Sequence, residues 1–291
     1  MTGLKTILDR LAPIDDAKVA GQLVEQARRV RARLSRVRRK VLVLSGKGGV
    51  GKSAVASQLA LALARRGEKV GVLDADLNGP CIPRMLGIAG RRLEFGRDGA
   101  APVEGPHGIR TASMSFLADP RGPVRWKGPM DLTPVWLGMM ESGVIRELLA
   151  DVVWGELDTL LFDLPPGAAA DKPPAIVGLV PDLHGAVVVT TPSAVAIDVV
   201  RRSIIYAREL GIRILGIVEN MGSAACPRCG GPVELSEGAA LALAEEAGVP
   251  LLARVPRDPD LARSLDTGVP LAYGHPISRV FLDLAERLSA P

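Results

Sequence analysis

From residue 41 onward, short apolar runs alternate with longer stretches in which apolar positions follow helical spacing. Runs of about four to eight apolar residues are typical of buried parallel strands, and longer Ala/Leu-rich stretches are typical of helices. The pattern predicts strands at 41–44, 70–73, 109–114, 159–162, 185–190, 214–218 and 251–255. It predicts helices at 54–64, 132–150, 194–210, 237–247 and 276–288. This alternation indicates an α/β fold: a mostly parallel twisted sheet with helices on both faces.

Residues 1–40 show a different pattern. Apolar residues spaced four and three apart predict one stripe on a helix: Leu23, Ala27, Val30, Leu34 and Val37. Eight of the chain's 36 basic residues lie in 28–40, which contains no acid. We therefore expect a basic helical N-terminal extension, 1–40, followed by one domain, 41–291. The stripe packs on that domain or on a partner subunit, and the basic face is either solvated or a surface for nucleic acid or an acidic membrane.

Composition narrows the class of protein. With 291 residues, 47% of them hydrophobic, the chain can bury a full core. No apolar run reaches the length of a membrane span and the N-terminus lacks a signal peptide's apolar core, so we expect a cytoplasmic protein. Aromatic residues make up only 3%, which disfavours nucleic acid as a stacked partner. Three cysteines are too few for a disulfide framework and indicate metal or redox chemistry.

Residues 45–53 read SGKGGVGKS and fit the phosphate-binding loop G-x-x-x-x-G-K-[ST] between a predicted strand and a predicted helix. The glycines let the backbone curl with its N–H groups facing inward, at the positive end of the helix dipole. We expect Lys52 to reach the β- and γ-phosphates and Ser53 to ligate Mg²⁺. The predicted phosphate-binding residues are Gly46, Lys47, Gly48, Gly49, Val50, Gly51, Lys52 and Ser53. The segment predicts a P-loop NTPase.

Carboxylates end two of the predicted strands. Asp163 is expected to anchor Mg²⁺ through water, and Gly167, four residues later, would offer its N–H to the γ-phosphate. Asp74 and Asp76 point the same way on an extended chain. We assign Asp74 to Mg²⁺ support through water and Asp76 to orienting the attacking water, with capping or turn formation as the alternative.

A second lysine, Lys47, lies near the start of the loop. It could extend to a nucleotide in a facing subunit and stabilise charge on the transferred phosphoryl group. The alternative is a spare, exposed lysine. Spacing alone does not separate these interpretations.

Cys226 and Cys229 form a C-x-x-C motif, with a proline that stiffens the turn between them. A tetrahedral metal site or a [4Fe–4S] cluster normally uses four protein ligands. The third cysteine, Cys81, lies near the nucleotide loops, and the three histidines show no ligand spacing. One chain is therefore two ligands short, and a two-fold dimer with one cysteine pair from each subunit would complete the site. Two structural cysteines without a ligand are the alternative.

At these motifs the sequence resembles the Mrp/ApbC family of iron–sulfur cluster carrier ATPases. This family lies within the deviant phosphate-loop dimers that include MinD, ParA and the nitrogenase iron protein. The resemblance runs from about residue 41 to 288 and rests on the segments 46–53, 74–80, 83–87, 163–167, 219–221 and 226–229.

The resemblance implies an ATP-hydrolysing homodimer that delivers iron–sulfur clusters to apo-proteins. Lys47 is similar to the signature lysine that crosses to the partner's phosphates, and Asn220 to the residue that contacts the adenine edge. Cys226 and Cys229 are similar to the pair that holds a bridging [4Fe–4S] cluster, with ATP turnover coupled to its loading or release.

Two departures from the family pattern stand out. After Gly167 the family usually continues Thr-Gly-Asp, whereas this chain has Ala-Ala-Ala-Asp, one residue longer and without the hydroxyl. This difference affects the switch and the rate of hydrolysis, and leaves nucleotide binding intact. Cys81 stands where the family often has Ser, and we expect a small buried thiol there.

Three functions compete on the sequence alone. The first is the homodimeric cluster-carrying ATPase. The second is a ParA/MinD-like positioning switch that binds DNA or membrane as an ATP dimer, supported only by the basic stretch 28–40. The third keeps the dimer and places structural zinc between the cysteine pairs.

Overall fold

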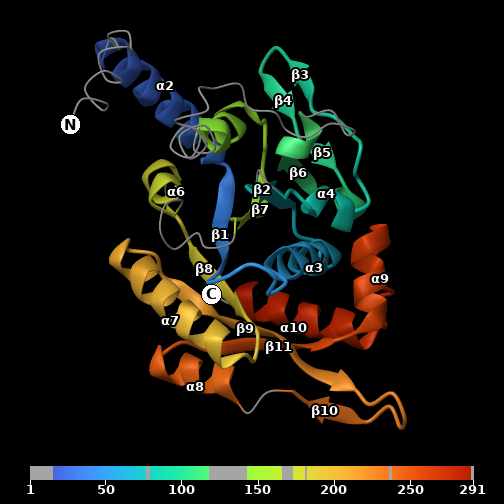
Figure 1. Ribbon diagram of the computed structural model, residues 1–291. Helices are drawn as coiled ribbons and strands as arrows, with labels where there is room; N and C mark the ends of the chain where they lie inside the picture. The colour runs from blue at the N-terminus through green and yellow to red at the C-terminus, as the bar shows by residue number, and fades with distance from the viewer. Residues whose placement is uncertain are drawn as a thin grey trace, which may run out of the picture.

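The computed structural model describes residues 16–76, 79–117, 143–165, 173–180, 182–235 and 238–289. Nine of the described strands form one sheet (Figure 1), in the order β10-β9-β8-β1-β7-β2-β6-β5, with β11 also paired to β9. All pairs are parallel except β5 with β6 and β9 with β10. The α/β class and the mostly parallel sheet are confirmed.

The central strands are buried on both faces, which explains their nearly continuous apolar runs. The nine strands of the sheet are β1 (Val37–Ser45), β2 (Val70–Asp74), β5 (Val103–Glu104), β6 (Arg110–Ser113), β7 (Leu157–Asp163), β8 (Gly185–Thr190), β9 (Ile214–Ala225), β10 (Pro232–Glu234) and β11 (Leu251–Arg257). A separate hairpin pairs β3 (Glu94–Gly96) with β4 (Gly99–Ala101). All seven predicted strands are present.

Helices cover both faces of the sheet (Figure 1). One face carries α3 (Lys52–Arg65) and α10 (Pro276–Ser289), which contact each other, and the other carries α7 (Ala194–Glu209) and α8 (Ala239–Glu246). Shorter helices are α4 (Ile82–Met85), α6 (Pro173–Leu179) and α9 (Pro259–Thr267), and residues 143–151 are also largely helical. The first part of the predicted helix 132–150 lies outside the described residues.

The N-terminal extension packs on the domain. Its helix α2 (Asp16–Leu34) buries Val30 and Leu34 completely. Arg33 donates to the carbonyl of Ala150 (3.3 Å). The predicted stripe was wrong at Val37, which opens β1 and pairs with β7. Strand pairing wins there because a β-branched residue beside a sheet buries its side chain without ordering another helical turn.

Strand β9 differs most from its predicted range. It continues through Ala225, seven residues beyond the predicted end, because β11 and β10 pair with its second half. Polar residues in this half therefore lie within the sheet. None of the described helices is long and apolar enough to cross a membrane.

Candidate nucleotide site and cysteine hairpin

The phosphate loop connects the end of β1 to the start of α3. Gly49 and Gly51 have φ values of 78° and 81°, a region that glycine enters without a steric penalty. Gly51 is the residue immediately before α3, so the loop ends at the positive end of the helix dipole. A cavity of about 210 Å³ lies over the loop and is also lined by Asp76 and Cys81.

At two positions of the loop, neighbouring atoms leave no room for a side chain, so only glycine fits. A Cβ at Gly46 would lie 2.9 Å from backbone atoms of Val199 and Val200 in α7. At Gly51 it would lie 2.1 Å from the amide nitrogen of Asn220. Residues far apart in the chain therefore close around the loop and keep it curled.

The lysine of the loop is buried against a strand-end acid. Lys52 is 6% exposed and forms an ion pair with Asp163, which has no exposed surface. The Lys52 ammonium also donates to the Ser53 hydroxyl (3.2 Å). Burial raises the pKa of Asp163, and the Lys52 ammonium offsets part of this rise. The second carboxylate oxygen, Oδ2, is buried with no hydrogen-bond partner among the described residues.

Asp74 lies beside Asp163 because β2 and β7 pair in parallel with these two residues in register. The Asp74 carboxylate accepts hydrogen bonds from the N–H groups of Asp76 (3.2 Å) and Ile82 (3.3 Å) and from the Ser113 hydroxyl (3.3 Å). Burial, followed by the negative charge of Asp163, raises its pKa well above the usual value. Two buried carboxyl groups at one edge of the sheet, next to a buried lysine, form a site that favours a bound cation.

The remaining predicted site residues lie in three places. Asp76 and Lys47 line the cavity over the loop, and Asp76 accepts a hydrogen bond from the Gly79 N–H (3.1 Å). Asn220 is buried, and its amide donates to the carbonyl of Val50 in the loop (2.9 Å). Gly167 and the altered segment after it lie outside the described residues.

The two cysteines of the C-x-x-C motif lie in the turn between β9 and β10. The Cys226 N–H donates to the Gly231 carbonyl (2.7 Å), and the Gly230 N–H donates back to the Cys226 carbonyl (2.8 Å). Cys226 is half-buried and Cys229 is exposed. Hydrogen bonds from the backbone N–H groups of Cys229 and Arg228 lower the pKa of Cys226. The turn therefore stabilises a thiolate, the form that binds metal.

The hairpin provides two ligands in the described part of the chain. No third His, Cys, Asp or Glu there brings a ligand atom within 4.8 Å of both thiols. Cys81 lies at the phosphate-loop cavity instead, where burial raises its pKa. The shortfall counted on the sequence also holds for the described fold.

A salt-bridge cluster that the sequence did not predict joins β11 to both strands of the cysteine hairpin, β9 and β10. Arg254 of β11 donates from Nε to Glu219 (2.8 Å) and from Nη2 to Glu234 of β10 (2.6 Å). Glu219 is buried, and its carboxylate lies so close to Gly222 that a Cβ there would be 2.5 Å away. Because β9 pairs with β11 only in the folded chain, no local pattern could reveal this cluster.

The sheet, the phosphate loop after its β1 and the strand-end acids define a P-loop NTPase. A family model described as "NUBPL iron-transfer P-loop NTPase" matches residues 36–289, and the chain belongs to that family.

Its relatives carry names that agree with this family. The "Iron-sulfur cluster carrier protein" of Saccharolobus solfataricus is 42% identical over 281 residues, which cover 95% of this chain and 91% of the relative. The human "Cytosolic Fe-S cluster assembly factor NUBP2" is 44% identical over 255 residues, which cover 86% and 91%.

Solved structures show the same fold. A nucleotide-binding protein from Archaeoglobus fulgidus in complex with ADP is 37% identical, with a TM-score of 0.71 over 83% of this chain and 91% of that one. The MinD cell division protein of Aquifex aeolicus is 21% identical, with a TM-score of 0.57 over 87% and 99%. This second likeness concerns the fold alone.

Proposed function

We propose that this chain is an ATP-hydrolysing carrier that assembles a bridging [4Fe–4S] cluster between two copies of itself and transfers it to cytoplasmic apo-proteins. The observation that carries the proposal is the Cys226/Cys229 turn on β9, because the same strand contacts the phosphate loop through Asn220. Relatives named as iron–sulfur cluster carriers and cytosolic assembly factors support this cargo.

The nucleotide half of the proposal rests on the phosphate loop. Lys52 would move from Asp163 to the β- and γ-phosphates, and the loop N–H groups would bind phosphate oxygens. The unpartnered Asp163 Oδ2 and the nearby Ser53 hydroxyl are hard oxygen donors that fit a hydrated Mg²⁺. When bound, Mg²⁺ would neutralise charge on the transferred phosphoryl group.

Other residues have proposed roles around this centre. Asp76 would orient the attacking water at the cavity it lines, and Asp74 would support the hydrated cation. Lys47 would reach the partner's nucleotide and stabilise the transition state. Gly167 would contact the γ-phosphate, and Asn220 would read the adenine edge while it holds the loop.

The metal half of the proposal rests on ligand number. Two thiols from each copy give the four ligands that a [4Fe–4S] cluster uses, and a two-fold axis through the cluster makes the contributions identical. Two side chains near the turn are large, apolar and exposed, namely Val233 (42%) and Leu235 (49%). Such residues suit a surface that another copy covers.

The test is anaerobic reconstitution with iron and sulfide, followed by iron, sulfide and mass analysis. We expect a brown dimer with four irons and four sulfides for each two chains. Cys226→Ser should remove the visible absorbance band, and the matched control Cys81→Ser, a cysteine outside the turn, should keep it. Transfer is then measured by activation of an apo-dehydratase that depends on a [4Fe–4S] cluster.

Two results would contradict this function. A colourless dimer that retains one zinc ion through the cysteines would identify a structural zinc site instead. A strictly monomeric protein that holds a full cluster through Cys226 and Cys229 would overturn the bridging arrangement.

A further inference from the structure

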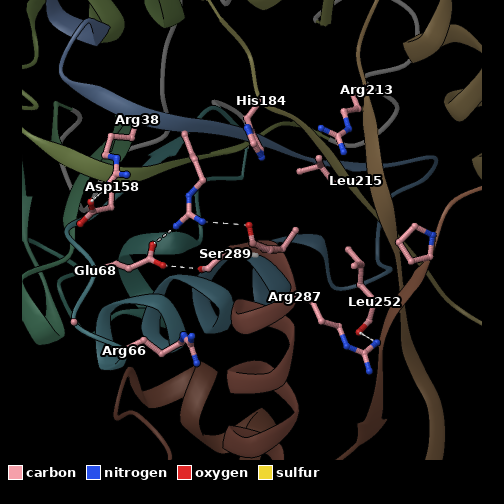
Figure 2. Close-up of a pocket in the computed structure, with 14 residues that line it drawn as sticks. Arg38, Arg66, Glu68, Asp158, His184, Arg213, Leu215, Leu252, Arg287 and Ser289 are labelled. Atoms are coloured by element: carbon pink, nitrogen blue, oxygen red, sulfur yellow. Dashed lines mark hydrogen bonds and ion pairs between the residues drawn. The ribbon is translucent and has the colours of Figure 1, made fainter. Parts of the chain in front are cut away.

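A second cavity of the described structure lies at the opposite edge of the sheet from the phosphate loop, at the amino ends of the strands. Its volume is about 810 Å³, within the range of small-molecule sites. Figure 2 shows its lining side chains, which come from the amino ends of β1, β7, β9 and β11, from the loop before β8 and from the ends of α3 and α10. Strand β1 runs from the cavity to the phosphate loop and is nine residues long. Since an extended strand rises roughly 3.3 Å for each residue, the cavity lies roughly 20 Å or more from the phosphate loop.

The cavity is strongly basic. Five arginines line it and only two carboxylates, those of Glu68 and Asp158, oppose them. The arginines are Arg38, Arg39, Arg66, Arg213 and Arg287. With His184 neutral, the lining has an excess of positive charge in a partly enclosed space, where charge interacts more strongly than in open water.

Two of the arginines are already neutralised. Arg39 donates to Glu68 (2.5 Å) and to Thr159 (2.9 Å). The Glu68 carboxylate in turn accepts from Ser289 (2.7 Å), so this pair belongs to the packing of the C-terminal helix. Arg38 pairs with Asp158 at 3.3 Å.

Within the part of the chain that the structure describes, the other three arginines have a weak acid partner or none. Arg66 lies 4.0 Å from Glu286, and Arg287 donates to the backbone carbonyls of Leu251 and Leu252. No carboxylate among the described residues pairs with Arg213 or Arg287. Guanidinium groups bind phosphate with two parallel hydrogen bonds, so three of them on different elements suit more than one phosphoryl group.

Three apolar residues also line the cavity, and we call them its apolar wall. They are Leu215 and Leu252, both labelled in Figure 2, and Pro250. We propose that the cavity binds a small organic molecule that carries two or more phosphoryl groups. Its phosphoryl groups would pair with Arg66, Arg213 and Arg287, and its organic part would lie against the apolar wall.

The pKa of His184 depends on the positive charge of the arginines that line the cavity. Its imidazole lies near Arg213 (Figure 2), and its pKa is lowered by burial, by Arg39 and by Arg213. A bound polyanion would cancel part of that positive charge. The pKa of His184 should then rise when the cavity fills, which gives a measurement independent of any substitution.

The test is a calorimetric titration with pyrophosphate in the absence of Mg²⁺. Wild-type protein should show two binding events, at the phosphate loop and at the cavity. Lys52→Met should remove the first event, and adding Arg213→Gln and Arg287→Gln should weaken the second at least about tenfold. The control Arg263→Gln removes an exposed arginine that pairs with Asp260 on α9, and should change neither event.

A proton NMR titration provides the second measurement, with the His184 signal assigned from a His184→Gln variant. Pyrophosphate should raise the pKa of His184 in Lys52→Met protein. The proposal is overturned if Lys52→Met protein binds no pyrophosphate, or if the two arginine substitutions leave its affinity and the His184 shift unaltered. Equal affinity for sulfate would also overturn it, because the cavity would then be a general anion site.

Discussion

Removing Arg254 should destabilise the fold where β11 meets β9 and β10, beside the cysteine turn. In Arg254→Gln, the buried Glu219 loses the guanidinium that neutralises it and Glu234 of β10 loses its connection to β11. The neighbouring Gly222 lies against the Glu219 carboxylate, and the Glu219 side chain is only 1% exposed. The negative charge of Glu219 then stays buried without the Arg254 guanidinium.

The loss of stability expected in Arg254→Gln depends on how far the Arg254 and Glu219 side chains are exposed to water. Removing one partner of a buried ion pair costs about 3–5 kcal/mol. Glu219 is 1% exposed but Arg254 is 45% exposed, so water screens the pair from one side. We therefore expect a loss of about 2–3 kcal/mol in the free energy of unfolding, of which the more exposed Glu234 pair contributes under about 1 kcal/mol.

The assay is urea unfolding of the metal-free and nucleotide-free protein, with Arg263→Gln as the control for an exposed pair. The control should change stability by less than about 0.5 kcal/mol. Adding Glu219→Gln to Arg254→Gln should recover most of the loss, because the buried negative charge is then removed together with the guanidinium that balanced it. Affinity of the hairpin for Co²⁺ should fall in Arg254→Gln and recover in Arg254→Lys. The reasoning is refuted if Arg254→Gln unfolds at the same urea concentration as the control.

The nucleotide site gives three more expectations. Lys52→Met should abolish ATP binding in a fluorescent-nucleotide titration, and unchanged affinity would refute the loop assignment. Because burial raises the pKa of Asp74 and Asp163 in the folded state, stability of the nucleotide-free protein conferred by these groups is fully present below the usual value of 3.8. It falls as the pH rises through the raised values, and Asp74→Asn should flatten that slope in urea unfolding; equal slopes would contradict it. Asn220→Ala leaves the buried Val50 carbonyl unpaired, and should cost about 1–3 kcal/mol in thermal unfolding and weaken nucleotide binding.

The buried acids illustrate a trade between stability and function. Asp74 and Asp163 are in register on adjacent strands, and their mutual repulsion adds to the cost of burial. A sheet built for stability alone would carry apolar side chains at these positions. A bound cation would remove the repulsion, so the cost in the free protein favours the nucleotide-bound state.

Local sequence determined the parts of this protein whose structure depends on neighbours in the chain. Apolar runs predicted the strands, and the loop predicted the phosphate site because its glycines, lysine and serine act within one turn. The cysteine pair likewise predicted a metal site from its own spacing. Val37 lay at the limit of this approach, since both a helical stripe and a strand suited its position.

Only the tertiary structure decided which distant residues meet. The pairing of β9 with β11 placed Arg254 beside Glu219, and the amino ends of β1 and β9 and the ends of α3 and α10 together gathered the arginines of the basic cavity. Asn220 holds the phosphate loop because β9 passes beside it. These contacts join residues tens to hundreds of positions apart in the chain. They form only when the apolar core of the whole domain is buried on folding, because that burial offsets the entropy lost in ordering distant segments. A local sequence pattern therefore cannot predict them.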